Sequence, residues 1–198
     1  MMIKDIIEIL KDSYKKNWIT PRDGNISYKP CNSNNFTITP SGLRKQELIE
    51  NDFVNIGFSE KKWIQLNNKH LKPSGEIELH FEIVRSIEKD ICVIHLHPTY
   101  TIAAMYSGVD LSKLATDFPE LKRYTRISKY IIDADPLSKD LAVKGRKCLH
   151  INALKDWYDF DIVGIHNHGV ISIGKNPYEA YEHIERLEHI CKIFLASK

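Results

Sequence analysis

The segment that most constrains the fold is residues 91–96, which read I-C-V-I-H-L. Most of these residues are apolar and several are β-branched, a pattern typical of a strand that is buried on both faces of a sheet. Such a strand needs other elements packed over each of its faces. Amphipathic or one-sided apolar patterns at residues 3–16, 76–87 and 177–196 predict helices that can form these layers.

The order of the remaining predicted elements bears on the type of sheet. Two further helices are expected at residues 99–106 and 138–152, and the last helix begins with Asn176 as N-cap and Pro177 in its first turn. Further strands are expected at residues 26–28, 36–39, 53–56, 62–66, 130–132, 162–166 and 170–173. Helices and strands intermix without a strict βαβ alternation, so we expect an α/β protein with one mixed or antiparallel sheet sandwiched by helices.

Composition excludes several classes of protein. The 198 residues carry 28 Lys and Arg against 26 Asp and Glu, and this net charge of +2 gives no basic surface for nucleic acid. Neither a zinc knuckle nor a disulfide framework is predicted, because the cysteines are far apart: Cys31, Cys92, Cys148 and Cys191. The chain has neither a signal-peptide pattern nor a run of about 18 apolar residues. We therefore expect a single cytoplasmic domain over residues 1–198 that binds neither nucleic acid nor a membrane.

Histidine pairs end two of the predicted strands. His95 and His97 project from the same face of the buried strand, so their imidazoles could coordinate one metal ion together. Two hydrogen-bonded histidines at a strand end are an equally good interpretation of H-x-H alone. His166 and His168 end a second apolar strand beside Gly169, and three imidazoles with an open fourth position describe a catalytic zinc site. Spacing alone does not decide between His166 and His168.

The other five histidines have more ordinary interpretations. His183 and His189 are six positions apart on the last predicted helix, so they point in directions about 240° apart and are expected to be surface or partner contacts. His70 and His150 have no motif around them and are expected at the surface. His80 lies four residues after a glutamate, which predicts a side-chain contact along the helix more than a metal role.

Three turns rich in small residues are candidate phosphate sites: Gly24-Asn25, Pro40-Ser41-Gly42 and Pro73-Ser74-Gly75. Each offers backbone N–H groups and side-chain donors that suit a phosphate, although each taken singly is more ordinary as a plain turn. The third turn begins a helix, whose N-terminal dipole favours an anion. Glu76, in the first turn of that helix, is either a simple cap or a general acid/base beside a metal. The sequence contains neither a nucleotide-binding glycine motif nor the G-x-S-x-G of hydrolases.

Five motifs follow one another along the chain: G-N-I-S at 24–27, T-P-S-G at 39–42, P-S-G-E at 73–76, H-L-H-P at 95–98 and H-N-H-G at 166–169. Together they closely resemble the class II aldolase/adducin family over about residues 3–195. The resemblance implies an α/β/α three-layer sandwich around a mostly antiparallel sheet. It also implies a homotetramer with its sites at the subunit interfaces.

The same resemblance implies roles for individual residues. Three histidines, His95, His97 and His168, would bind zinc or another divalent ion such as cobalt or manganese, and Glu76 would be the catalytic acid/base. The phosphate of a small sugar substrate would be held by Gly24, Asn25, Ser41, Gly42, Ser74 and Gly75.

The activity that the resemblance implies is metal-dependent aldol cleavage of a ketose 1-phosphate, similar to L-fuculose 1-phosphate, into dihydroxyacetone phosphate and an aldehyde. The metal would stabilise the enediolate that forms as the C3–C4 bond breaks, and Glu76 would move the proton. The alternatives within the family are a methylthioribulose-1-phosphate dehydratase and a pentulose-5-phosphate 4-epimerase. A non-catalytic adducin-like scaffold is a further alternative. The presence of the three histidines and Glu76 argues against it.

Overall fold

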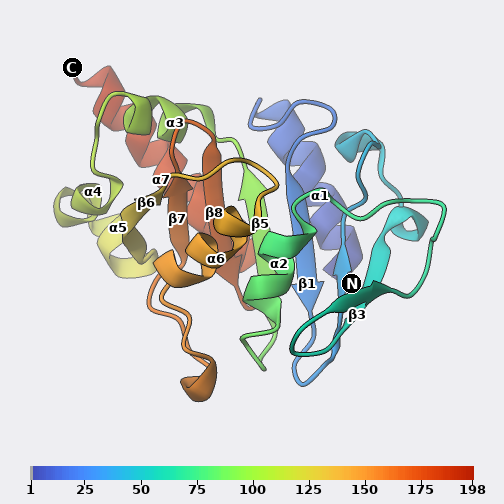
Figure 1. The fold of residues 1–198 in the computed structure, drawn as a ribbon. Coiled ribbons are helices and arrows are strands. Elements are labelled where there is room, and N and C mark those ends of the chain that lie inside the picture. Colours follow the sequence, from blue (N-terminus) through green and yellow to red (C-terminus); the bar gives the residue numbers. More distant parts are fainter. Residues whose placement is uncertain (1) are drawn as a thin grey trace.

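An eight-stranded sheet forms the centre of the computed structural model, which describes residues 2–198 (Figure 1). The strands are β1 Asn25–Lys29, β2 Asn35–Ile38, β3 Val54–Phe58, β4 Trp63–Gln65, β5 Ile91–Leu96, β6 Ile127–Ile132, β7 Ile162–Ile165 and β8 Gly169–Gly174. Their order across the sheet is β4-β3-β2-β1-β5-β8-β7-β6. All neighbours pair antiparallel except β6 and β7, which pair parallel, so the sheet is mixed and mostly antiparallel, as predicted.

Helices cover both faces of this sheet. The α-helices of the described residues are α1 Met2–Lys15, α2 Ile77–Val84, α3 Thr99–Tyr106, α4 Leu111–Asp117, α5 Pro119–Tyr124, α6 Lys139–Cys148 and α7 Pro177–Ala196. Short 3-10 helices occur at Lys45–Glu47, Glu50–Asp52 and Ala153–Lys155. Helices α1, α3 and α7 pack on one face of the sheet, and α2 and α6 cover the other (Figure 1). The fold is therefore the α/β/α three-layer sandwich that the motifs implied.

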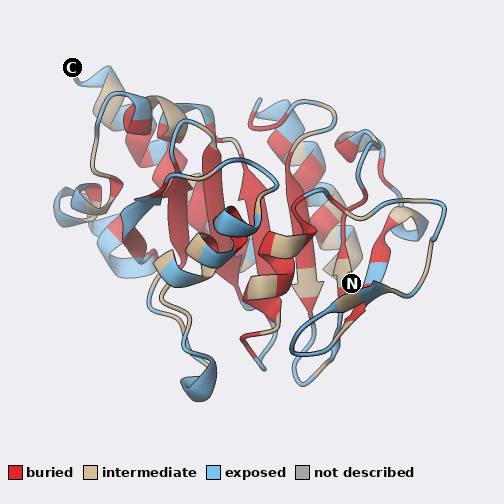
Figure 2. Cartoon of the chain, viewed as in Figure 1, coloured by how far each residue is buried: buried red, intermediate tan, exposed pale blue. Residues whose placement is uncertain are grey.

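The central strand β5 faces a hydrophobic cluster on each side. Cys92 and Ile94 pack in the cluster that includes α1, α3 and α7, whereas Val93 packs in the cluster that includes α2 and α6. Every residue of β5 is buried, and Figure 2 shows the buried strands enclosed by helices whose outer faces are exposed. Since alternate residues of a strand share a face, the His95 side chain lies on the α2 side of the sheet.

Two short helices, α4 and α5, lie where no helix was predicted. Asp110 caps α4, because its carboxylate accepts a hydrogen bond of 3.0 Å from the Ser112 backbone N–H. Pro119 occupies the first turn of α5. The two helices have only seven and six residues, which is too short for helical periodicity to be recognised.

The boundaries of other elements also differ from the prediction. The predicted helices at 76–87 and 138–152 end earlier, at Val84 and Cys148. After α6 the chain reverses through His150, whose φ of 52° lies outside the range of a right-handed helix. Strand β6, conversely, begins three residues before the predicted segment at 130–132.

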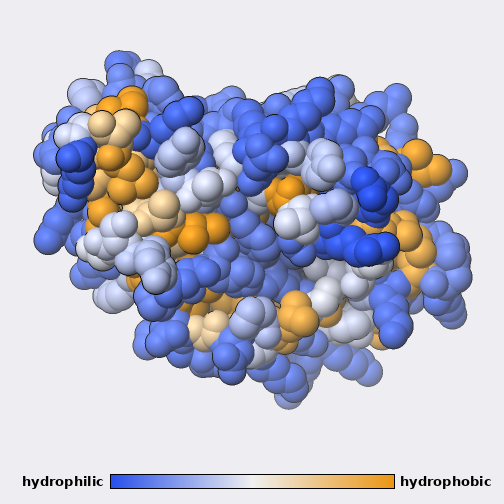
Figure 3. Space-filling view, turned by 90° about the horizontal axis from the view of Figure 1, so that it is seen from above, coloured by the Kyte–Doolittle hydropathy of each residue, from blue (hydrophilic) through white to orange (hydrophobic). Residues whose placement is uncertain are grey.

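The molecular surface is mainly hydrophilic where it is seen from above, with small scattered hydrophobic groups (Figure 3). The carboxyl end of β5 points toward this side in Figure 1. None of the helices within residues 2–198 combines the length and the hydrophobicity that a membrane span requires.

Candidate active site

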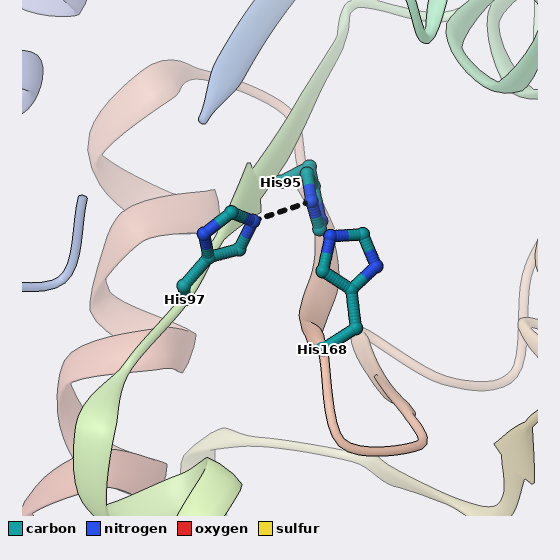
Figure 4. Close-up of side chains that lie close together, drawn as sticks. All are labelled: His95, His97 and His168. Carbon is teal, nitrogen blue, oxygen red and sulfur yellow. Dashed lines mark hydrogen bonds between the residues drawn. The ribbon is translucent and has the colours of Figure 1, made fainter. Parts of the chain in front are cut away.

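Three imidazoles meet at the carboxyl end of β5 (Figure 4). His95 lies within β5, His97 follows that strand directly, and His168 immediately precedes β8. Strands β5 and β8 are antiparallel neighbours with Leu96 opposite Val170, so the end of one strand lies beside the start of the other. The ring centroids of the three histidines are 4.8–4.9 Å apart, and one ring nitrogen from each lies within 4.8 Å of the others.

The hydrogen bonds of these rings fit a bound divalent cation. The His95 Nδ1 is 3.0 Å from the Val170 carbonyl oxygen, which leaves its Nε2 to face the His97 Nε2 at 2.9 Å. The buried Nδ1 of His168 has no hydrogen-bond partner within the described residues. Burial lowers the pKa of His95 and of His97 to about 3, and neutral imidazole is the form that binds a metal. His95, bonded through its second ring nitrogen to a backbone carbonyl, is oriented as metal-binding histidines usually are.

His166, the alternative to His168, is not part of this cluster. Its side chain is exposed, and its backbone N–H donates to the Ile132 carbonyl oxygen at 2.8 Å. The residue between the two histidines, Asn167, has a positive φ of 52°. This turn places His168 over the end of β5 and leaves the His166 side chain exposed.

Glu76 lies beside the histidine cluster at the N-terminus of α2, where it is the N-cap residue. Its side chain is buried, and its Oε2 accepts a hydrogen bond of 3.1 Å from the Asn25 Nδ2. The same oxygen is 3.5 Å from the His95 Nε2. Burial raises the pKa of the Glu76 carboxyl, and the Asn25 hydrogen bond opposes that rise. A carboxyl group with this raised pKa is suited to exchange protons with a bound molecule.

The second and third predicted turns are joined by backbone hydrogen bonds. The Ser41 N–H donates to the Lys72 carbonyl oxygen at 2.8 Å, and the Ser74 N–H donates to the Thr39 carbonyl oxygen at 3.0 Å. The turn pattern predicts that these two N–H groups are available to a ligand. In the structure both are already used in backbone hydrogen bonds, so that part of the prediction is wrong. No hydrogen bond within residues 2–198 uses the N–H groups of the turn glycines, Gly24, Gly42 and Gly75.

A cavity of about 270 Å³ connects the turns with the histidine cluster. The predicted site residues that line it are Gly24, Asn25, Ser41, Ser74, Gly75, Glu76, His95, His97 and His168. Gly42 is next to the lining, and its carbonyl oxygen accepts a hydrogen bond of 3.0 Å from the Arg22 Nε. Three turns, a carboxyl group and three imidazoles from distant parts of the sequence thus share one cavity.

Five lining residues were missed by the motifs: Arg22, Asp23, Lys45, Pro136 and Leu137. The Lys45 Nζ is buried and donates to the Pro40 carbonyl oxygen at 2.7 Å, and burial lowers its pKa to about 8. Arg22 and Lys45 flank the G-N and S-G turns in the sequence, and basic residues beside candidate phosphate turns were the signal that could have revealed them. Leu137, which has a φ of 62°, comes from the segment before α6 and had no such signal.

Two histidines outside the cluster have surroundings that differ from the predicted ones. His183 is buried, and its Nδ1 is 3.1 Å from the Thr125 hydroxyl, so the expected surface position was wrong. His80 is completely buried and contacts Asn25 and Ser27. Its predicted contact along the helix is replaced by contacts across to β1, because α2 packs over that strand.

Comparison with known proteins places this chain in a family. The model of the Class II Aldolase and Adducin N-terminal domain matches residues 4–195. The chain therefore belongs to the class II aldolase and adducin family.

Several relatives match along nearly their whole length. The L-fuculose phosphate aldolase of Methanococcus maripaludis is 28% identical over 193 residues, which cover 98% of this chain and 95% of the relative. The methylthioribulose-1-phosphate dehydratase of Geobacillus thermodenitrificans is 29% identical over 197 residues, covering 94% and 87%. The crystal structure of L-fuculose-1-phosphate aldolase from Thermus thermophilus has a TM-score of 0.73 at 18% identity, covering 99% of this chain and 94% of that one. The structural likeness supports the fold alone.

Proposed function

We propose that this chain is a metal-dependent lyase that cleaves a ketose 1-phosphate, similar to L-fuculose 1-phosphate, into dihydroxyacetone phosphate and an aldehyde. The observation that carries the proposal is the single cavity lined by the histidine cluster, by Glu76 and by the small-residue turns. A metal-ligand set, a buried acid/base and a group of anion donors are the parts that cleavage of a sugar phosphate needs.

The substrate phosphate is proposed to lie against the three turns. The unpartnered glycine N–H groups and the Ser41 and Ser74 hydroxyls can donate to its oxygens. Arg22 and Lys45 add positive charge on the same side of the cavity. Binding of this non-reacting group would hold the sugar in position at the histidine cluster.

The proposed chemistry divides between the bound cation and Glu76. A divalent cation held by the three imidazoles supplies a Lewis acid for the carbonyl and hydroxyl oxygens of the sugar. Glu76 takes the proton of the C4 hydroxyl, the electron pair of the C3–C4 bond passes to C3, and Glu76 returns the proton to C3. The raised pKa of its carboxyl favours this exchange, because the protonated form persists closer to neutral pH.

A second candidate is dehydration of a ketose 1-phosphate. It is supported by relatives named methylthioribulose-1-phosphate dehydratase, which match at the same level of identity as the aldolases. Pro136 and Leu137 add an apolar wall to the cavity, and this wall suits an apolar substituent on the sugar. In this reaction Glu76 would take the C3 proton while hydroxide leaves from C4.

The remaining parts of the proposal rest on the family alone. They are zinc, or cobalt or manganese, as the bound cation, and a homotetramer that acts in the cytoplasm. A His₃ site accepts each of these cations according to geometry and supply.

The function is tested by comparing zinc-loaded wild-type protein with Glu76→Gln on a panel of ketose 1-phosphates. We expect dihydroxyacetone phosphate release by the wild type, and a kcat about 10²-fold to 10⁴-fold lower in Glu76→Gln because the proton carrier is lost. Glu78→Gln is the matched control, since Glu78 lies on the same helix and bonds to the Trp63 Nε1 outside the cavity.

The products decide between the two candidates. Dihydroxyacetone phosphate identifies aldol cleavage, whereas a product lighter than the substrate by one water identifies dehydration. A zinc-loaded wild type that forms neither product from any ketose 1-phosphate would refute the proposed function.

A further inference from the structure

A buried chain of hydrogen bonds ends on Glu76. The Ser27 Oγ is 2.6 Å from the His80 Nδ1, and the His80 Nε2 is 2.5 Å from the Asn25 Oδ1. The Asn25 Nδ2 in turn donates to the Glu76 Oε2 at 3.1 Å. All four side chains are buried, and the chain joins strand β1 to the first turn of α2.

The donors and acceptors of this chain run in one direction. Because the Asn25 Nδ2 donates to a carboxylate, the Asn25 Oδ1 faces His80 and can only accept a hydrogen bond. The His80 Nε2 must then carry a proton, which leaves Nδ1 to accept from the Ser27 hydroxyl. Burial lowers the pKa of His80 to about 3, in agreement with one neutral tautomer.

The two oxygens of Glu76 have different surroundings. Oε2 bonds to Asn25 and lies near His95, whereas no hydrogen bond within residues 2–198 involves Oε1. Oε1 is not one of the buried side-chain atoms that lack a hydrogen-bond partner, so this oxygen is accessible. Glu76 also lines the cavity. Oε1 is therefore the oxygen that faces the cavity.

We propose that His80 is a positioning residue, which acts through Asn25 to hold Glu76 Oε2 in place and leave Oε1 free toward the cavity. The amide of Asn25 could otherwise rotate and present its oxygen to the carboxylate, which would replace an attraction with a repulsion. In the tautomer protonated on Nε2, His80 opposes this rotation, because its Nε2–H would then face an amide N–H and neither group can accept a hydrogen bond. Asn25 keeps a second Nδ2 hydrogen, so this role is compatible with donation to a substrate phosphate.

Two substitutions of His80 separate positioning from simple core packing. Glutamine places its amide near the His80 Nε2 and retains a donor for Asn25, whereas asparagine reaches only the position of Nδ1 beside Ser27. Both residues are polar amides that remain buried. A purely structural role for His80 gives no reason for the shorter variant to lose turnover selectively.

The kinetic test rests on the proposed function. We expect His80→Gln to keep kcat within about threefold of the wild type, and His80→Asn to lower kcat about tenfold or more with KM within about twofold. His183→Gln and His183→Asn are the matched controls, because His183 is also buried and bonds to Thr125 away from the cavity. Equal kcat values for the two His80 variants, or a loss confined to KM, would overturn the proposal.

A second readout is independent of any substrate. Crystal structures of the two His80 variants should retain the Asn25–Glu76 hydrogen bond in His80→Gln, and show a turned Asn25 amide or a displaced Glu76 carboxylate in His80→Asn. An unchanged Glu76 in His80→Asn would refute the positioning role even if no substrate were turned over. If the wild type were inactive but the two variant structures were as expected, only the proposed function would be refuted and the positioning role would stand.

Discussion

His168 and His166 are separated by one residue, yet their surroundings differ completely. The ring of His168 lies against those of His95 and His97, whereas the side chain of His166 is exposed. The pair therefore provides a natural test of the metal site, in which a ligand and its near neighbour are compared within one turn.

We expect His168→Ala to lose most of its bound zinc, because two imidazoles hold the ion much less tightly than three. His166→Ala should retain the wild-type metal content. The measurement is the zinc-to-protein ratio by inductively coupled plasma mass spectrometry after dialysis against a weak chelator. Equal zinc content in the two variants would contradict the assignment of His168.

Single residues explain which parts of the site could be predicted. His95, His97 and Glu76 could be picked out as candidates because imidazole and carboxylate groups at the ends of elements recur in motifs that follow one another in a set order along the chain. Lys45 and Leu137 could not be predicted in the same way. Their place in the cavity depends on the packing of loops that no local pattern describes.

Gly169 of β8 packs tightly against the end of β5, beside the histidine cluster. A Cβ on Gly169 would lie 2.4 Å from the Leu96 carbonyl oxygen and 2.8 Å from the His97 Cδ2. Both atoms are held by the sheet or by the histidine cluster, so neither can move aside easily. The glycine in the H-N-H-G motif is therefore required by the distance between two strands.

We expect Gly169→Ala to lower the free energy of unfolding by about 2 kcal/mol, because the added methyl group overpacks the contact between the strands. It should also weaken zinc binding by displacing His97. The measurements are urea unfolding and zinc content.

Gly57→Ala is the control for this substitution. Its Cβ would meet the flexible, half-exposed Leu66 side chain at 3.1 Å, and that side chain can yield. A Gly169→Ala variant as stable as Gly57→Ala would contradict the account of the close approach.

The predictions of helices and strands are confirmed where the sequence pattern is long or unambiguous. The buried run of β5 and the helices α1 and α7 occur within a few residues of their expected positions. Helices α4 and α5 were missed because two helical turns are too short to display a periodic pattern.

Across the whole molecule, four histidines share one response to pH, because burial also lowers the pKa of His183. Burial lowers the pKa of His80, His95 and His97 to about 3, whereas an unfolded chain holds histidine near its ordinary value of about 6.5. Below that value the unfolded state binds more protons than the folded state, so stability falls as pH falls. Glu76, with its raised pKa, acts in the opposite direction but contributes one proton against those of four histidines.

We expect the free energy of unfolding of metal-free protein to decrease from pH 7 to pH 5. Each histidine that titrates fully on unfolding contributes about 1.4 kcal/mol per pH unit. The measurement is urea unfolding at several pH values in the presence of a chelator. His80→Gln should have a slope that is smaller by one proton, and a flat profile for the wild type would show that these histidines are not buried in neutral form.

The sequence by itself determined the type of fold, the buried central strand and the residues able to bind a metal or carry a proton. These features follow from apolar periodicity and from the chemistry of side chains at the ends of elements. Only the tertiary structure decided how these residues meet, for example the contacts of Asn25 with Glu76 and of Ser27 with His80 across more than fifty residues. Such contacts depend on the order of strands in the sheet and on the helix that covers it, which local sequence patterns do not encode.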